Sequence, residues 1–145
     1  AGCQLVASCD LAIASHEARF AVSGINLGLF CATPAVALSR NIHPKHAMEM
    51  LLTGEFISPL KAQNLGLINR VVPAEELTSA TRELANTISQ KASAAVRTGK
   101  AMFYPQLDME LEKAYEYASE HMVNNLKDAD TQSGLNAFIN KKSRN

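Results

Sequence analysis

The sequence predicts an α/β fold in which a mixed core layer is followed by a helical extension. Short apolar runs typical of buried strands occur up to Pro73, with helix signals between them. Beyond Pro73, apolar residues recur at helical spacing. This change in composition divides the chain into a core part, residues 1–73, and a helical extension, residues 74–145, rather than two independent domains.

The opening residues form a small-residue turn that runs directly into a short helix. The first amides of a helix lack partners within it and lie at the positive end of its dipole. The turn at Ala1 and Gly2 therefore suits an anion, either a phosphate or an oxyanion that develops during a reaction. The plain alternative is a buried helix that simply starts at glycine.

Three short strands and one loop are expected in the core part. The apolar runs at residues 11–15 and 18–22 predict two strands, and residues 67–72 predict a third, closed by a proline. The loop at residues 23–28 contains two glycines. They permit positive φ or a close backbone approach, as both binding loops and plain turns require.

Proline and glycine delimit the short helices of the core part. Thr33 and Ser58 are each followed by proline, the pattern of an N-cap and first helical position. Pro44 starts another helix, which ends at Gly54. The signals predict helices over residues 33–41, 44–53 and 59–66.

The helical extension shows amphipathic stripes, which indicate core or subunit contact. Pro105 is expected to interrupt the second of its helices. The stripes predict helices over residues 77–88, 92–104, 107–122 and 130–142.

Composition and ligand spacing exclude several classes of function. Lys+Arg and Asp+Glu both number 14, with no basic stripe, so no nucleic-acid partner is expected. No apolar run approaches the ~18 residues of a membrane span. His43 and His46 lack a third ligand nearby, so no metal site is expected. The odd number of cysteines, without a Cys-x-x-Cys pair, indicates reduced thiols that act as apolar fillers.

Ordered motifs along nearly the whole chain resemble the crotonase superfamily of enoyl-CoA hydratases and isomerases. The resemblance implies a crotonase-like (ClpP/crotonase) spiral of ββα units with a helical C-terminal extension, assembled as a homotrimer or a hexamer. It corresponds to the C-terminal half of such a protein, so an upstream segment is expected. The motifs are Gly-Cys-Gln-Leu at 2–5, Ala-Ser-Cys-Asp-Leu-Ala-Ile-Ala-Ser at 7–15, Ala-Arg-Phe-Ala-Val at 18–22, Leu-Thr-Gly with Ile-Ser at 52–58, Ala62, Gly-Leu-Ile at 66–68 and Val-Val-Pro at 71–73.

The resemblance implies an acyl-CoA thioester as substrate or ligand, with no permanently bound cofactor. Family members stabilise the thioester enolate with two backbone N–H groups. One is expected from the upstream half and the other from the turn at Ala1 and Gly2. Near the end, Phe138 and Lys141 match a segment that helps hold CoA, although an exposed tail lysine is the plain alternative. A location in the mitochondrial matrix is also implied, although no transit peptide is visible.

The two glutamates used by hydratases of this family are replaced here, by Gln4 and Gly24. An amide cannot exchange protons at neutral pH, and glycine has no side chain. Each acid–base group typically contributes about 10²–10⁴-fold, so conventional hydratase activity should be weak. Three possibilities remain: an enzyme that uses only the polarised thioester, a non-catalytic acyl-CoA-binding protein that regulates fatty-acid metabolism, or a structural subunit.

Overall fold

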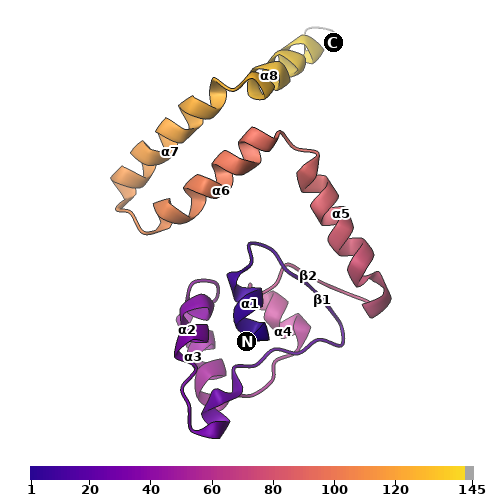
Figure 1. Cartoon of the computed structure of the whole chain (residues 1–145), viewed down its shortest axis with the longest axis vertical. Coiled ribbons are helices and arrows are strands. Elements are labelled where there is room, and N and C mark those ends of the chain that lie inside the picture. The colour runs from indigo at the N-terminus through magenta and orange to yellow at the C-terminus, as the bar shows by residue number, and fades with distance from the viewer. Residues whose placement is uncertain (143–145) are drawn as a thin grey trace. The chain divides into compact units, whose positions relative to one another are not determined.

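The structure, a computed structural model, describes residues 1–142 and the side chains of residues 1–140 (Figure 1). It divides into two compact units, Ala1–Glu83 and Leu84–Asn145, which are considered separately. This division falls inside α5 (Leu77–Ser89), later in the chain than the change in composition at Pro73. The assignment of residues 1–73 and 74–145 to separate functional parts stays a prediction.

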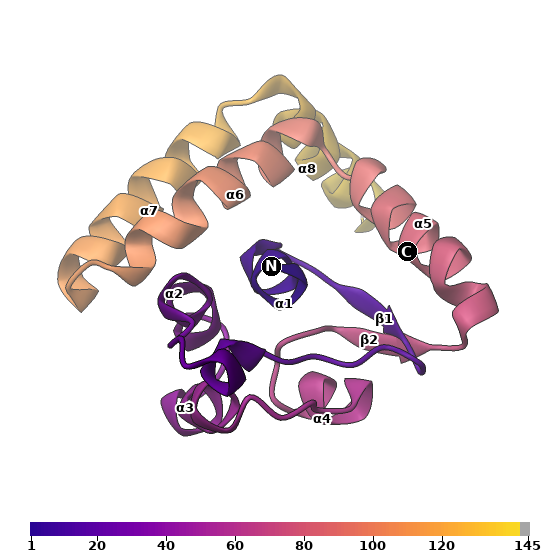
Figure 2. The same cartoon turned by 60° about the horizontal axis from the view of Figure 1, so that its bottom comes forward.

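The first unit contains four complete α-helices, a two-stranded sheet, two short 3₁₀ helices and the start of α5. The helices are α1 (Gly2–Ser8), α2 (Ala32–Ser39), α3 (Pro44–Thr53) and α4 (Pro59–Asn64). Helix α2 packs against both α1 and α3, as Figure 2 shows. Their shared core contains Leu38, Ala47, Met50, Leu51 and Ala62, each at most 3% exposed.

Two helix starts in this unit follow the capping signals of the sequence. Helix α2 instead starts at Ala32 with Cys31 as its N-cap residue, so the predicted cap at Thr33 was wrong. The Nδ1 atom of His43 accepts a hydrogen bond from the Lys45 amide (3.3 Å) at the start of α3. Ser58 Oγ accepts one from the Lys61 amide (3.1 Å) at the start of α4. Gly54 ends α3 in the left-handed conformation, with φ of 64°. The predicted helix starts at Pro44 and Pro59 are therefore confirmed.

The sheet consists of β1 (Ile13–Ser15) and β2 (Arg70–Val72), which run parallel. Asn69 holds them in register from one end. Its amide donates to the Ala12 carbonyl (2.8 Å), and its side-chain oxygen accepts from the Ala12 amide (2.8 Å). Two predicted strands are therefore present, although each is shorter than its apolar run.

The prediction of a strand over residues 18–22 was wrong. Phe20 forms only an isolated antiparallel bridge with Ile57, through N–H···O bonds of 3.1 and 2.9 Å. The partner segment is the short connection between α3 and α4, which is too short to extend a ladder. Phe20 and Val22 are nevertheless both buried, whereas Arg19 and Ala21 are more exposed, so buried and exposed side chains alternate as in a strand.

The second unit contains α6 (Ser93–Leu107), α7 (Leu111–Leu126) and α8 (Ala129–Lys142). Helices α6 and α7 lie side by side in both views, and α8 contacts each of them (Figures 1 and 2). A short 3₁₀ helix, η2 (Ala74–Glu76), precedes α5. Among the described residues, no helix combines the length and apolar character needed to cross a membrane.

The expected interruption at Pro105 was also wrong, because α6 continues through this residue to Leu107. A proline removes one backbone donor and disturbs the preceding turn. Here the helix ends two residues later, so little helix follows the disturbance. The side chain of Gln106 also donates to the Phe103 carbonyl (3.0 Å), which supplies a donor for this last turn.

Candidate functional site

Helix α1 begins at Gly2, with Ala1 as its N-cap residue. Ala1 and Gly2 are exposed, and a methyl group placed on Gly2 would meet no atom within 4 Å. The Leu5 amide donates to the Ala1 carbonyl (3.0 Å) and thereby closes the first turn. Amides that precede it in a helix have no carbonyl one turn earlier to bind. The turn can therefore direct N–H groups at an incoming anion or carbonyl oxygen.

One face of α1 is held in the core. Cys3 and Ala7, one turn apart, are both buried. The side chain of Asn41 donates to the carbonyls of Ala7 (2.6 Å) and Ala37 (2.8 Å), which ties the end of α1 to α2. Gln4 is half-buried next to this anchored face, so the helix defines the direction in which its side chain leaves.

The predicted site residues fall into two groups. Gln4 on α1 and Gly24 on the 3₁₀ helix η1 (Ser23–Leu27) both belong to the first unit, where α1, α2, α3 and η1 pack in series. Phe138 lies on α8 of the second unit and is 59% exposed. Lys141 is on the same helix, but its side chain lies outside the described residues.

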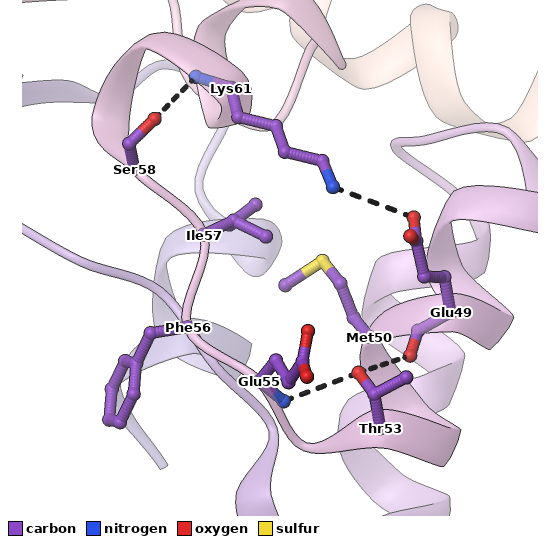
Figure 3. A pocket seen from close by; sticks show the side chains of 8 residues that line it. All are labelled: Glu49, Met50, Thr53, Glu55, Phe56, Ile57, Ser58 and Lys61. Carbon is purple, nitrogen blue, oxygen red and sulfur yellow. Dashed lines mark hydrogen bonds and ion pairs between the residues drawn. The ribbon is translucent and has the colours of Figure 1, made fainter.

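A small cavity lies between the end of α3 and the start of α4 (Figure 3). Its volume is about 120 Å³. Typical ligand pockets measure about 300–1,000 Å³, so this cavity is too small for an acyl-CoA. It is lined by Glu49, Met50, Thr53, Glu55, Phe56, Ile57, Ser58 and Lys61.

Several polar groups of this cavity already serve the ends of the two helices. Thr53 Oγ1 donates to the Glu49 carbonyl (2.8 Å) and accepts from the Glu55 amide (3.3 Å). The ammonium group of Lys61 lies 3.6 Å from a carboxylate oxygen of Glu49 (Figure 3). Sequence reasoning did not foresee this cavity, although the Thr-Gly and Ser-Pro signals mark the helix ends that border it. We therefore assign the polar groups that line this cavity a role in ending α3 and starting α4.

The described residues include no group of three or more His, Cys, Asp or Glu side chains that could hold a metal ion. The rings of His43 and His46 are 6.1 Å apart, and His43 acts as the N-cap of α3.

The three thiols differ in exposure: Cys3 is buried, Cys31 is intermediate and Cys9 is exposed. Burial raises the pKa of the Cys3 thiol above its ordinary value of 9.0, because the thiolate is poorly solvated there.

We predict that iodoacetamide at pH 8 alkylates Cys9 in the folded protein much faster than Cys3, because only the thiolate reacts. Peptide mass spectrometry at successive times measures both rates. In urea the two rates should converge. Equal rates in the folded protein would contradict the burial of Cys3.

Comparison with known proteins shows one consistent family. A family model described as enoyl-CoA hydratase/isomerase matches residues 1–145. Enoyl-CoA hydratase domain-containing protein 3, mitochondrial, from Mus musculus is 53% identical over 142 residues, which is 98% of this chain and 47% of that relative. Its Homo sapiens counterpart is 49% identical over the same 98% and 47%. The chain thus spans about half the length of these relatives.

Solved structures agree with this result. The crystal structure of an enoyl-CoA hydratase from Mycobacterium smegmatis has a TM-score of 0.95 at 52% identity, and covers 97% of this chain and 55% of its own. The crystal structure of human enoyl coenzyme A hydratase domain-containing protein 3 has a TM-score of 0.93 at 49% identity, with the same coverage. The predicted crotonase-like fold class is therefore confirmed.

Proposed function

This chain belongs to the enoyl-CoA hydratase/isomerase family, and on that premise we propose that it contributes part of an acyl-CoA thioester site. In this proposal, main-chain amides in the turn at Ala1 and Gly2 donate to the thioester oxygen as it acquires enolate charge. The usual pair of glutamates is replaced by Gln4 and Gly24, so the chemistry depends on a polarised thioester. The proposed chemistry uses the same thioester activation as the family, but it lacks the two glutamates that usually move protons.

One observation carries this proposal: the first turn of α1 lies directly before a residue that is anchored in the core. Gly2 has no neighbour within 4 Å of the position of a β-carbon, and Cys3 directly after it is buried. Donors that are already in place before the reaction need little reorganisation when charge develops. A first turn held by an anchored helix face supports an oxyanion site for this reason.

The energetic consequence depends on which interactions remain. A donor of this kind contributes about 2.7–4 kcal/mol where one has been removed from an enzyme. Gln4 can hold a water molecule or a carbonyl by hydrogen bonds, but it cannot accept and return a proton at neutral pH. The site should therefore polarise the thioester carbonyl but add water poorly to a C=C bond. Reactions that start from the polarised thioester, such as isomerisation or thioester hydrolysis, then need a base other than Gln4 to take up the proton.

Helix α8 is proposed to help hold the CoA portion of the ligand. Phe138 is 59% exposed, and Lys141 follows it by three positions, a spacing that places both on one side of a helix. An aromatic ring and an ammonium group suit the adenine and phosphate parts of CoA. Exposure of Phe138 supports this role.

A homotrimer or a hexamer built as a dimer of trimers is proposed for the assembled protein. The second unit exposes large apolar side chains that a subunit contact would cover. Their exposed fractions range from 60 to 73% at Ile139, Met122, Tyr115 and Leu111. We propose a location in the mitochondrial matrix from the names of the relatives described above.

A second candidate is a non-catalytic acyl-CoA-binding protein that regulates fatty-acid metabolism. It is favoured by the absence of an ionisable group at both Gln4 and Gly24. Mass spectrometry of products separates the two candidates, because a non-catalytic protein returns every acyl-CoA unchanged. An enzyme converts at least one acyl-CoA to product, at a rate proportional to the concentration of the enzyme.

The oxyanion proposal is tested by removing the Gly2 N–H group. Proline is tolerated at the first helical position, which Gly2 occupies, and it lacks the donor. We expect Gly2→Pro in the full-length protein to weaken binding of acetoacetyl-CoA, a thioester that readily forms an enolate, by about 10²-fold or more. Isothermal titration calorimetry measures the change.

Gly2→Ala is the matched control, because it keeps the amide and adds a methyl group where no atom lies within 4 Å. It should bind like the parent protein. Equal weakening in both variants would count against the amide donor. An absence of heat with the parent at high micromolar ligand would instead favour a purely structural subunit.

A further inference from the structure

The space around Gly24 is already filled by its own loop. A β-carbon at Gly24 would lie 2.5 Å from Cys31 Sγ and 2.9 Å from the Leu29 carbonyl oxygen. Contacts below 3.0 Å require a neighbour to move. The backbone of Gly24 does not have positive φ, so the obstacle to a side chain is steric.

Both neighbours are held by contacts of their own. The Leu29 oxygen belongs to the main chain, and the Leu29 amide donates to the Gly24 carbonyl (3.0 Å), which closes the loop on itself. Cys31 is the N-cap residue of α2, and its side chain packs against the hydrophobic core. Its carbonyl accepts from the Ala35 amide (3.0 Å), so its backbone is also held by the helix.

The same loop is anchored on its other side by α3. A β-carbon at Gly54 would lie 2.9 Å from Ile25 Cγ2 and 3.0 Å from Asn26 Nδ2, which shows how closely η1 packs on the end of α3. The loop is thus held by its own Leu29–Gly24 hydrogen bond and by the contacts of Ile25 and Asn26 with the end of α3. It has little freedom to withdraw if a side chain is added at Gly24.

From this packing we infer that Gly24 and Cys31 form a blocking pair, which excludes any side chain, and therefore any proton-transferring carboxylate, from position 24. The inference rests on the proposed function, because it gives the loss of the second family acid a cause within this chain. Cys31 acts on the site only through its contact with Gly24, because its Sγ atom takes up the space that a side chain at position 24 would need. Restoring an acid at position 24 requires a change at Cys31 as well.

A stability cycle tests the blocking pair without any ligand. Alanine normally stabilises a loop relative to glycine by restricting the unfolded chain. We nevertheless expect Gly24→Ala in the full-length protein to lower Tm by about 4 °C or more, because the methyl group overpacks the loop. Cys31→Ala removes the closer neighbour, so the double variant should regain at least half of that loss. Differential scanning calorimetry measures all four proteins.

Gly99→Ala is the matched control, because its added methyl group meets no atom within 4 Å. Its Tm should stay constant or rise, since alanine favours a helix. An unchanged Tm in Gly24→Ala would overturn the blocking pair, and so would losses that simply add in the double variant.

An activity cycle tests the consequence for chemistry. In a Gln4→Glu background, Gly24→Glu alone should leave crotonyl-CoA hydration unchanged or lower it. Gly24→Glu with Cys31→Ala should raise hydration at least tenfold above Gly24→Glu alone. Equal rates in these two proteins would overturn the blocking role of Cys31. Calorimetry with acetoacetyl-CoA reports separately on the thioester site. An absence of binding would contradict the proposed function, whereas intact binding with equal hydration rates would contradict only the blocking pair.

Discussion

Replacing Gln4 with glutamate is expected to raise the rate of crotonyl-CoA hydration by about 10²-fold, the lower end of what one acid–base group contributes. A carboxylate at this position can accept a proton from water, which the amide cannot do. Burial of Cys3 and Ala7 holds α1 in place, so the new side chain should leave the helix in the direction of Gln4. Loss of absorbance of the enoyl thioester follows the reaction.

Ser8→Glu is the control for added charge on the same helix. Ser8 lies one turn after Gln4, is exposed, and donates its hydroxyl to the Gln4 carbonyl (2.9 Å). This variant should leave hydration unchanged. A flat response of Gln4→Glu with intact ligand binding, or an equal gain in Ser8→Glu, would count against the placement of the acid site.

The largest expected loss of stability follows truncation of Leu38. This side chain is completely buried (0% exposed) on α2, the helix that packs against both α1 and α3. Leu38→Ala removes apolar contacts and leaves a cavity, so we expect the free energy of unfolding to fall by about 2–5 kcal/mol. That is a large part of the roughly 5–15 kcal/mol by which a folded protein is typically stable. Urea denaturation of the two proteins measures the difference in the free energy of unfolding.

Val36→Ala provides the comparison on the same helix, because Val36 is 54% exposed. Its free energy of unfolding should change by no more than about 0.5 kcal/mol. Similar losses in the two variants would mean that α2 does not occupy the centre of the first unit.

Local signals in the sequence accounted for most of the helices. The proline at Pro44, the cap at Ser58 and the glycine at Gly54 act within one turn of backbone, so their effects can be read from neighbouring residues. Pro105 misled the prediction, because its effect depends on how much helix follows it. The segment at residues 18–22 misled it as well, since a strand needs a partner that apolar alternation alone does not reveal.

The candidate site was predicted only in part. Gln4 and Gly24 were identified by residue type and by resemblance to the family, and both are described in the first unit. The crowding of Gly24 by Cys31 was not foreseen, because the contact joins residues seven positions apart across a turn. The roles of Phe138 and Lys141 stay predictions.

The sequence by itself determined that neither Gln4 nor Gly24 can carry a proton, because side-chain type decides this. It also determined where most helices begin and end, since capping is local. Only the tertiary structure decided that Gly24 has no room for a side chain, and that Cys3 on α1 is buried. Space and burial depend on how the backbone turns back on itself and packs, and residue types alone do not specify this.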